Sequence, residues 1–169
     1  MRRLPVIRKK SFFLVIPLML VLLLAACSAG SVGGSGSGSG ATPAPTTVKG
    51  YGTAQGCPSD VVVTTAPPAA GVTVHITQSH STVTAHTGDI VQFNLPFGQR
   101  WSGPTSSVGG LEMQTPSGYA DKTSKVCVWR FVAKGTGTSM VNFYGRAICL
   151  KGQLCPQYVM NVPFEVSVK

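Results

Sequence analysis

Hydrophobic and polar residues alternate along most of the chain after residue 50, and turn-forming residues interrupt the pattern at short intervals. The clearest case is Val162–Val168, where valine or phenylalanine occupies every second position. A period of two is typical of a strand that buries one face and exposes the other. The pattern predicts about eight or nine short strands, with expected segments at 60–65, 72–76, 81–85, 91–95, 111–114, 127–133, 141–143 and 162–168.

Strands at this spacing, with no 3.6-residue periodicity after the N-terminal segment, favour an all-β sandwich or barrel. Cys127 is in phase with Trp129 and Phe131, which places all three on a buried face. A core cysteine beside a tryptophan resembles an immunoglobulin-like antiparallel β-sandwich, and we expect that fold. Pro163 interrupts the last strand, which predicts an edge position or a bulge there.

The N-terminus has the pattern of an export signal. Five basic residues precede an almost purely apolar run, Ser11–Leu24, which is followed by Ala25, Ala26 and Cys27. A basic segment, a short apolar segment and small residues at the cleavage site define a secretory signal peptide. The apolar run is shorter than the roughly 20 residues that span a bilayer. We therefore expect a signal helix that is removed.

The tail Leu24–Cys27 resembles the bacterial lipobox. The resemblance implies that the thiol of Cys27 receives a diacylglyceryl group and that the chain is cut just before it. An ordinary cleaved signal with a coincidental cysteine, or an uncleaved signal anchor, are the alternatives. The expected location is extracytoplasmic, on the bacterial cell membrane, either at the cell surface or facing the periplasm.

Ser28–Gly40 is rich in glycine and serine, and Pro43 and Pro45 follow it. Such a sequence forms a flexible spacer with a span of roughly 20 Å. The predicted organisation is a signal peptide (1–26), a lipidated cysteine with a disordered linker (27–50) and a β-sandwich domain (51–169).

Charge gives little support for nucleic-acid binding. The whole chain carries +9, but five of its 14 basic residues precede Cys27, so nine basic and five acidic residues remain, a net charge of +4. The remaining basic residues are scattered and form no stripe for phosphates. We expect no nucleic-acid partner.

Four cysteines remain after Cys27, namely Cys57, Cys127, Cys149 and Cys155. An even number in an exported chain indicates disulfides, and four cysteines allow three pairings. We favour Cys149–Cys155, which closes a short loop between two strands, and Cys57–Cys127 then follows. A metal site is the alternative, but no Cys-x-x-Cys pair supports it.

Catalytic and metal-binding patterns are weak. His75, His80 and His86 lie near turns or on opposite strand faces, and no carboxylate or cysteine at a ligand spacing accompanies them. No serine lies in a Gly-x-Ser-x-Gly motif, and the five acidic residues are far apart in sequence. We predict no enzyme activity, metal or cofactor.

The loop Leu95–Pro104 has the residue types of a binding surface, because aromatic and arginine side chains are common contact anchors. Trp101 has an alternative role, packing inward at the start of the next strand, and Trp129 is expected in the core. The candidate binding residues are Phe97, Gln99, Arg100 and Trp101, together with Tyr119 and Arg146.

Segments 87–95 and 129–146 resemble the chagasin-like inhibitors of papain-type cysteine proteases, which are immunoglobulin-like sandwiches that insert three loops into a protease cleft. The resemblance covers about half of the chain after Cys27. It places the three loops at 96–103, 117–122 and 146–156, with Trp101 at the family's tryptophan.

The first hypothesis is a non-catalytic, lipid-anchored module that binds a protein, a peptide or an envelope polymer through one loop end. The alternative is a cysteine-protease inhibitor that uses the three loops. An enzyme of unrecognised type is the third hypothesis.

Overall fold

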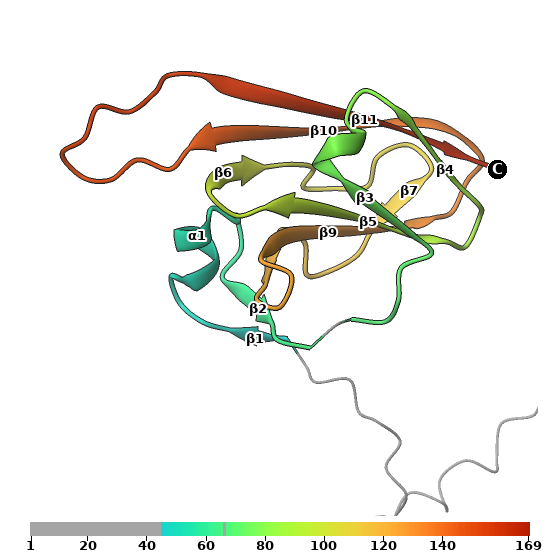
Figure 1. The fold of residues 1–169 in the computed structure, drawn as a ribbon. Coiled ribbons are helices and arrows are strands. Elements are labelled where there is room, and N and C mark those ends of the chain that lie inside the picture. Colours follow the sequence, from blue (N-terminus) through green and yellow to red (C-terminus); the bar gives the residue numbers. More distant parts are fainter. Residues whose placement is uncertain (1–44, 66) are drawn as a thin grey trace, which may run out of the picture. The chain divides into compact units, whose positions relative to one another are not determined.

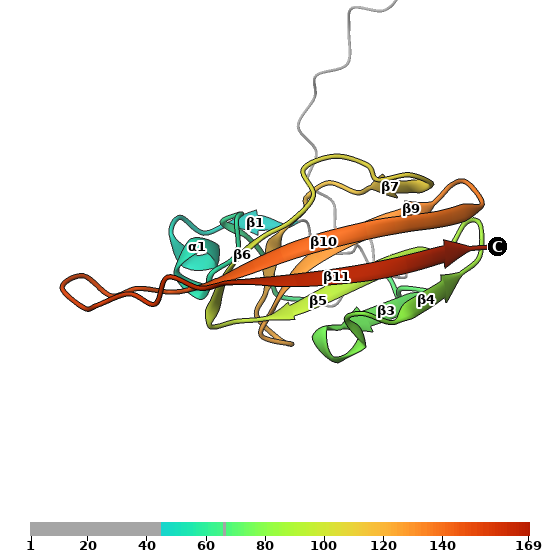
Figure 2. The ribbon, with the colours of Figure 1, turned by 90° about the horizontal axis from the view of Figure 1, so that it is seen from above.

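The computed structural model describes residues 45–65 and 67–169. The predicted signal peptide, Cys27 and most of the predicted linker lie outside the described residues. The described chain forms two β-sheets that face each other, which confirms the predicted all-β sandwich (Figures 1 and 2). Within it, no helix is long and apolar enough to cross a membrane.

The first sheet has seven strands in the order β1-β2-β8-β9-β5-β3, and β7 pairs with β9 beside β8. Its strands are β1 (Thr46–Thr47), β2 (Val61–Val63), β3 (Val72–His75), β5 (Ile90–Pro96), β7 (Leu111–Met113), β8 (Tyr119–Asp121) and β9 (Val126–Ala133). β1 lies within the range predicted as linker, so the folded domain begins before residue 51.

The second sheet has the order β4-β11-β10-β6. Its strands are β4 (Thr82–Ala85), β6 (Gln99–Ser102), β10 (Gly137–Ala147) and β11 (Val159–Val168). β10 and β11 form the longest hairpin, in register from Gly137 opposite Val168 to Arg146 opposite Val159.

Most strand pairs are antiparallel, as the predicted antiparallel sandwich requires, but three pairs are parallel. β3 pairs with β5, β2 with β8, and β4 with β11 in parallel. β3 and β4 are consecutive, but they belong to different sheets. The chain crosses between the sheets through a 3-10 turn, η1 (Ile76–Gln78), where the pattern predicted a continued strand.

Pro163 does not lie on an edge strand, because β11 lies between β10 and β4. The lack of an N–H group at Pro163 nevertheless removes no hydrogen bond between strands. Pairing with β4 starts only at Glu165, and the carbonyl of Pro163 accepts a hydrogen bond from the backbone N–H of His80 at 3.0 Å. The predicted edge position is therefore wrong, because β11 is an internal strand. Pro163 is tolerated there because it precedes the segment of β11 that pairs with β4.

The core is built from the inward faces of both sheets. Cys127, Trp129 and Phe131 are buried, as their phase on β9 predicted. Phe143 of β10 has its ring centroid 5.3 Å from that of Phe93 and 5.0 Å from that of Trp129. These tilted and edge-on contacts between sheets are the favoured aromatic geometry.

A short helix that the sequence pattern did not predict, α1 (Tyr51–Gln55), packs beside the sandwich. It ends at Gly56, which adopts a left-handed conformation with φ 96°. A Cβ at Gly56 would lie 1.9 Å from the backbone oxygen of Gln99, so only glycine allows this close approach of α1 to β6.

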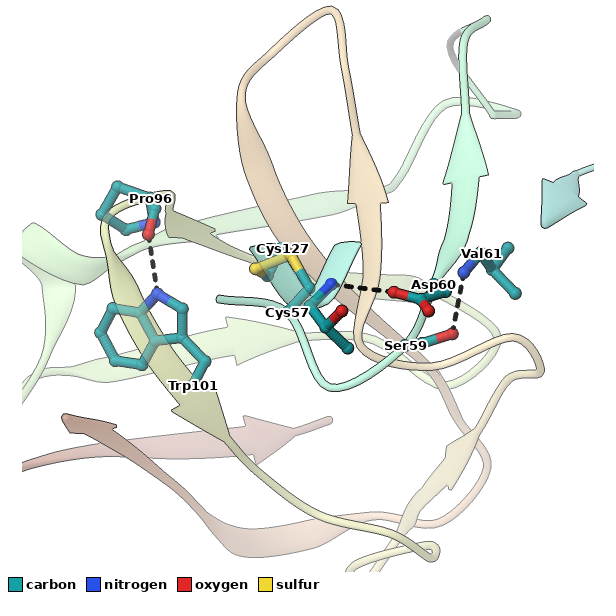
Figure 3. The surroundings of a disulfide bond; sticks show 8 residues. Cys57, Ser59, Asp60, Val61, Pro96, Trp101 and Cys127 are labelled. Atoms are coloured by element: carbon teal, nitrogen blue, oxygen red, sulfur yellow. Dashed lines mark hydrogen bonds between the residues drawn. A yellow bond between two sulfur atoms is a disulfide. The ribbon is translucent and has the colours of Figure 1, made fainter. Parts of the chain in front are cut away.

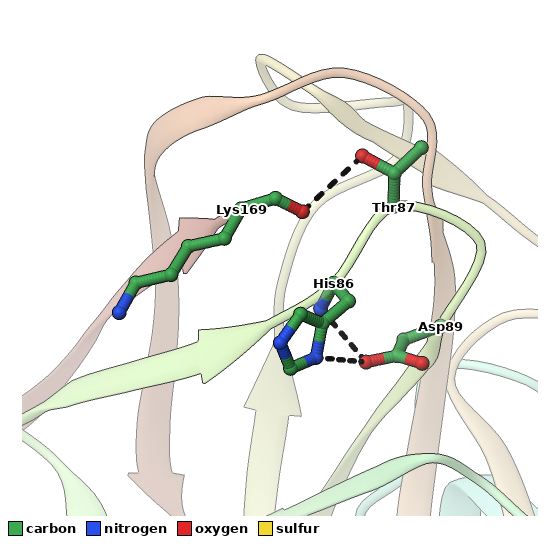
Figure 4. Close-up of polar contacts among 4 residues, drawn as sticks. All are labelled: His86, Thr87, Asp89 and Lys169. Carbon is green, nitrogen blue, oxygen red and sulfur yellow. Dashed lines mark hydrogen bonds and ion pairs between the residues drawn. The ribbon is translucent and has the colours of Figure 1, made fainter.

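The end of the molecule near the C-terminus is tied by backbone and histidine contacts (Figure 4). Thr87 donates its backbone N–H to the carbonyl of Lys169 at 3.0 Å. Asp89 accepts a hydrogen bond from the backbone N–H of His86 at 2.8 Å, and the His86 ring lies 3.6 Å from the same carboxylate oxygen. These residues close a turn, which gives Asp89 a structural role.

Candidate functional site

Four segments meet at the end of the sandwich opposite the C-terminus: α1, the β5–β6 turn, the β8–β9 turn and the loop after β10 (Figure 1). Phe97 donates its backbone N–H to the carbonyl of Lys125 at 3.2 Å, and Trp101 donates its own to the carbonyl of Gly56 at 2.8 Å. The ammonium group of Lys122 lies 4.3 Å from the ring centroid of Tyr51. These contacts fix α1, the β5–β6 turn and the β8–β9 turn into one end surface. The loop after β10 starts beside them, because Ala147 at the end of β10 pairs with Gln99 of β6.

A disulfide between Cys57 and Cys127 joins the residue after α1 to the start of β9, as predicted (Figure 3). The two Cα atoms are 5.4 Å apart, and both residues are buried. Trp101 lies close by and donates its indole N–H to the carbonyl of Pro96 at 2.7 Å. The disulfide and this hydrogen bond together hold the base of the end surface.

The second predicted disulfide, Cys149–Cys155, closes a loop between β10 and β11. We call residues 148–158 the arm, because this loop extends beyond the rest of the sandwich in both views (Figures 1 and 2). Leu150 is 64% exposed and Leu154 is fully exposed, and Tyr158 is half exposed. Large apolar side chains displayed together on a projecting loop are typical of an interaction surface.

Two arginines lie at the base of the arm. Arg100 of β6 and Arg146 of β10 are directly opposite each other in register. Like charges at such a position destabilise a sheet, and neither arginine forms an ion pair with a described residue. Segments 95–104 and 144–160 contain no acidic residue. The arrangement therefore presents an uncompensated positive charge.

A hollow of about 240 Å³ lies between the arginines and the arm. Its lining includes Arg100, Arg146, Tyr158 and both cysteines of the Cys149–Cys155 disulfide. We define the distal surface by the exposed charged and apolar side chains around this hollow: Arg100, Arg146, Leu150, Lys151, Leu154 and Tyr158.

The predicted binding residues are only partly brought together. Arg100 and Arg146 lie on the distal surface. Phe97 is half-buried and packs against the core edge. Gln99 is opposite Ala147, and its side-chain carbonyl oxygen is buried with no partner among the described residues. Phe97 and Gln99 thus support the base of this end, next to the arginines.

Trp101 is 2% exposed, so the expected exposed contact surface is wrong at this residue. It is the third residue of β6 and packs inward, which was the alternative role. Tyr119 is 3% exposed and lies in β8, on the other sheet, so the structure does not bring it to the distal surface. Burial raises the pKa of the Tyr119 phenol, against an opposing effect of the Arg130 charge.

The apolar arm is the feature that the sequence interpretation missed. Leu150 and Leu154 lie inside the predicted disulfide loop, where alternation stops and no strand explains two leucines. Two leucines in a short disulfide-closed loop were the feature of the sequence that could have predicted an exposed apolar surface. Within residues 45–65 and 67–169, no group of three histidine, cysteine or acidic side chains is placed to hold a metal ion.

No protein-family model matches the chain, and no curated protein matches it. Among solved structures, the chain has a distant similarity to the cysteine protease inhibitor EhICP2 from Entamoeba histolytica, with 13% identity and a TM-score of 0.38, covering 58% of this chain and 94% of that one. The solution structure of amebosin is similar at 11% identity and a TM-score of 0.34, covering 58% and 97%. Nothing about function follows from likenesses at this level.

Proposed function

We propose that this chain is a non-catalytic, lipid-anchored binding module of the bacterial envelope, and that the distal surface holds a protein or peptide partner. The observation that carries the proposal is the pairing of exposed leucines on a disulfide-closed arm with an uncompensated arginine pair at its base. Grouped exposed apolar side chains mark interaction sites, and arginine and tyrosine are enriched at protein interfaces.

The positive charge of the distal surface indicates which kind of partner it would bind. Arg100, Arg146 and Lys151 are exposed, and no acidic side chain occurs in the segments that carry them. Acidic groups on a partner would remove the repulsion between the two arginines and guide the encounter. The partner we propose therefore has an apolar contact area bordered by carboxylates.

The anchor and spacer fit this role. A chain fixed to the membrane by Cys27 and separated from it by a glycine- and serine-rich segment would place its domain within reach of partners outside the cytoplasm. The domain needs no chemistry of its own for that task.

Site-directed photo-crosslinking in intact cells tests the proposal. A photoreactive amino acid at Leu154, on the arm, is compared with one at Thr138, which is exposed near the opposite end of β10. We expect a protein adduct of one discrete mass from position 154 and none of that mass from position 138. Equal adducts from both positions, adducts to lipid alone, or no adduct would contradict the proposal.

Cysteine-protease inhibition is the second candidate. One structural observation favours it beyond the sequence resemblance: the β5–β6 turn and the arm, which carry two of the three expected loops, lie at the same end, with Gln99 opposite Ala147. The third expected loop, 117–122, contains the buried strand β8. Titration of papain with the full chain distinguishes the candidates. Stoichiometric inhibition that Leu154→Asp abolishes would favour the inhibitor, and undiminished papain activity would exclude it for this protease.

A further inference from the structure

A second hollow, of about 500 Å³, lies on the outer face of the first sheet and shares no lining residue with the distal surface. We call it the groove. Arg130 and Val132 of β9 and Tyr119 of β8 contribute to its lining. They come from positions that alternate with the core-facing residues of the same strands. Segment 112–116 also lines it, as do Pro67 and Pro68, which belong to the connection between β2 and β3.

Arg130 is a buried cation that forms no ion pair with any residue of the described ranges. Its side chain is only 7% exposed. One terminal nitrogen donates a hydrogen bond to the carbonyl of Pro68 at 2.6 Å, while Nε has no partner among the described residues. A buried charge that is incompletely hydrogen-bonded is costly, and an anion beside it removes much of that cost.

Each acidic side chain has another partner among the described residues, and none of them forms an ion pair with Arg130. Glu112, at the rim of the groove, lies 3.5 Å from the ammonium of Lys134. Asp121 accepts hydrogen bonds from the backbone N–H groups of Thr123 and Ser124. Asp60 and Asp89 hold backbone turns, and Glu165 accepts a hydrogen bond from Thr82. Residues 1–44 contain no aspartate or glutamate, so the N-terminal segment has no carboxylate to offer.

Much of the remaining lining is apolar, and Thr65, Gln114, Thr115 and the Glu112–Lys134 pair add polar groups. Proline rings at positions 45, 67, 68 and 116, with Val63, Met113 and Val132, supply apolar contact area. Burial raises the pKa of Tyr119, so at neutral pH its phenol keeps its proton and can donate a hydrogen bond. A cation and a donor among apolar walls match the common design of small-ligand pockets.

We propose that the groove binds an apolar carboxylate, with the anionic group at the guanidinium of Arg130 and the apolar body against Pro67, Pro68 and Met113. The same chemistry is offered by a free small acid and by the C-terminal residue of a peptide. The inference is independent of the proposed function, because it uses none of the residues of the distal surface.

Calorimetric titration of the full chain in detergent tests the inference without any substitution. The probes are N-acetyl-phenylalanine and its amide, which differ in charge but hardly in shape, and an octapeptide ending in phenylalanine with and without an amidated C-terminus. We expect an acid to bind roughly ten- to a hundredfold more tightly than its amide, the range of a charge-assisted hydrogen bond. Equal affinities for acid and amide, or no saturable binding of any probe, would overturn the inference.

Two variants assign the preference to Arg130. Arg130→Gln should abolish the preference for the acid, provided that circular dichroism shows a folded chain. Val132→Glu leaves Arg130 in place and supplies a competing carboxylate from the same face of β9, so it should weaken acid binding without removing the cation. Thr84→Glu, exposed on β4 of the other sheet, is the control and should bind like the unaltered chain.

The two pairs of probes also distinguish a free small acid from the C-terminal residue of a peptide as the ligand. Tight binding of N-acetyl-phenylalanine indicates that a free small acid suffices. Binding of the octapeptide acid alone indicates a peptide C-terminus. An acid preference that survives both Arg130→Gln and Val132→Glu would refute the assignment to this groove.

Discussion

Asp60 organises the backbone around α1 with one carboxylate. Its two oxygens accept hydrogen bonds from the backbone N–H groups of Gly50 at 2.8 Å and Thr53 at 3.0 Å. These bonds lower the pKa of Asp60 from its ordinary value of 3.8, because they favour the charged form. A carboxylate whose pKa is lowered on folding stabilises the fold above its unfolded pKa, and this contribution disappears as the pH falls through the lowered value.

We predict that Asp60→Ala accelerates hydrogen exchange at the amides of Gly50 and Thr53, because both lose their acceptor. In the unaltered chain, the protection of these amides should hold at neutral pH and fall below about pH 4, since protonation weakens the acceptor. Asp89→Ala, at the other end of the sandwich, is the control and should leave exchange at α1 unchanged. Unchanged exchange at both amides in Asp60→Ala would contradict this role.

Phe143 lies at the centre of the aromatic contacts between the sheets, with Phe93, Trp129 and Phe164 around it. We predict that Phe143→Ala lowers the free energy of unfolding by about 3–5 kcal/mol, the usual effect of emptying such a core position. Tyr144→Ala, at the exposed neighbouring position, should change it by less than about 1 kcal/mol. Chemical denaturation measures both, and equal effects would show that the aromatic cluster is not the centre of the core.

At the scale of elements, the two disulfides restrict loops of very different length. Cys57 and Cys127 are 70 residues apart, and Cys149 and Cys155 are six apart. In the chain-entropy model, the long loop contributes about 4 kcal/mol and the short one about 2 kcal/mol.

We predict that the double variant Cys57→Ala with Cys127→Ala loses more stability than Cys149→Ala with Cys155→Ala. The first pair fixes α1 to β9 within the core, whereas the second only constrains the arm. Denaturation of both variants under non-reducing conditions measures the difference. A larger loss from the arm disulfide would contradict the prediction.

The sequence predicted elements well where one face of a strand is buried and the other is exposed. β5 and β11 show this alternation along their whole length, and their predicted positions are confirmed. β8 escaped prediction because all three of its residues are buried, so no alternation appears. α1 is only five residues long, which is too short for a helical period.

The candidate site was predictable only in part, because it also depends on a short strand that has no clear pattern in the sequence. Arg100 and Arg146 stood out by residue type, but the register that places them opposite each other depends on β6, a four-residue strand within a glycine- and proline-rich stretch. Burial of Trp101 depends on the same strand. The groove at Arg130 had no signal in the sequence, because it requires the β2–β3 connection to cross β9.

At the scale of the whole molecule, we propose that one chain combines a lipid anchor, a spacer and a binding domain. We predict that peptide mapping of the chain from its native membrane fraction finds a mature N-terminus at Cys27 with the mass of an attached lipid. Cys27→Ser removes the thiol that lipidation requires and should give neither the lipid mass nor that N-terminus. An unmodified Cys27, or a chain that starts elsewhere, would contradict the anchor.

Crosslinking from position 154 in intact cells, compared between charge variants, tests the proposed role of the distal surface. The chain with Arg100→Glu and Arg146→Glu is compared with one carrying Lys134→Glu and Lys169→Glu, an equal charge change away from the distal surface. We predict that the first pair of substitutions removes most of the protein adduct and that the second pair leaves its yield unchanged. An adduct that is equally abundant in both variants would show that the arginine pair does not hold the partner, which would contradict the proposed function.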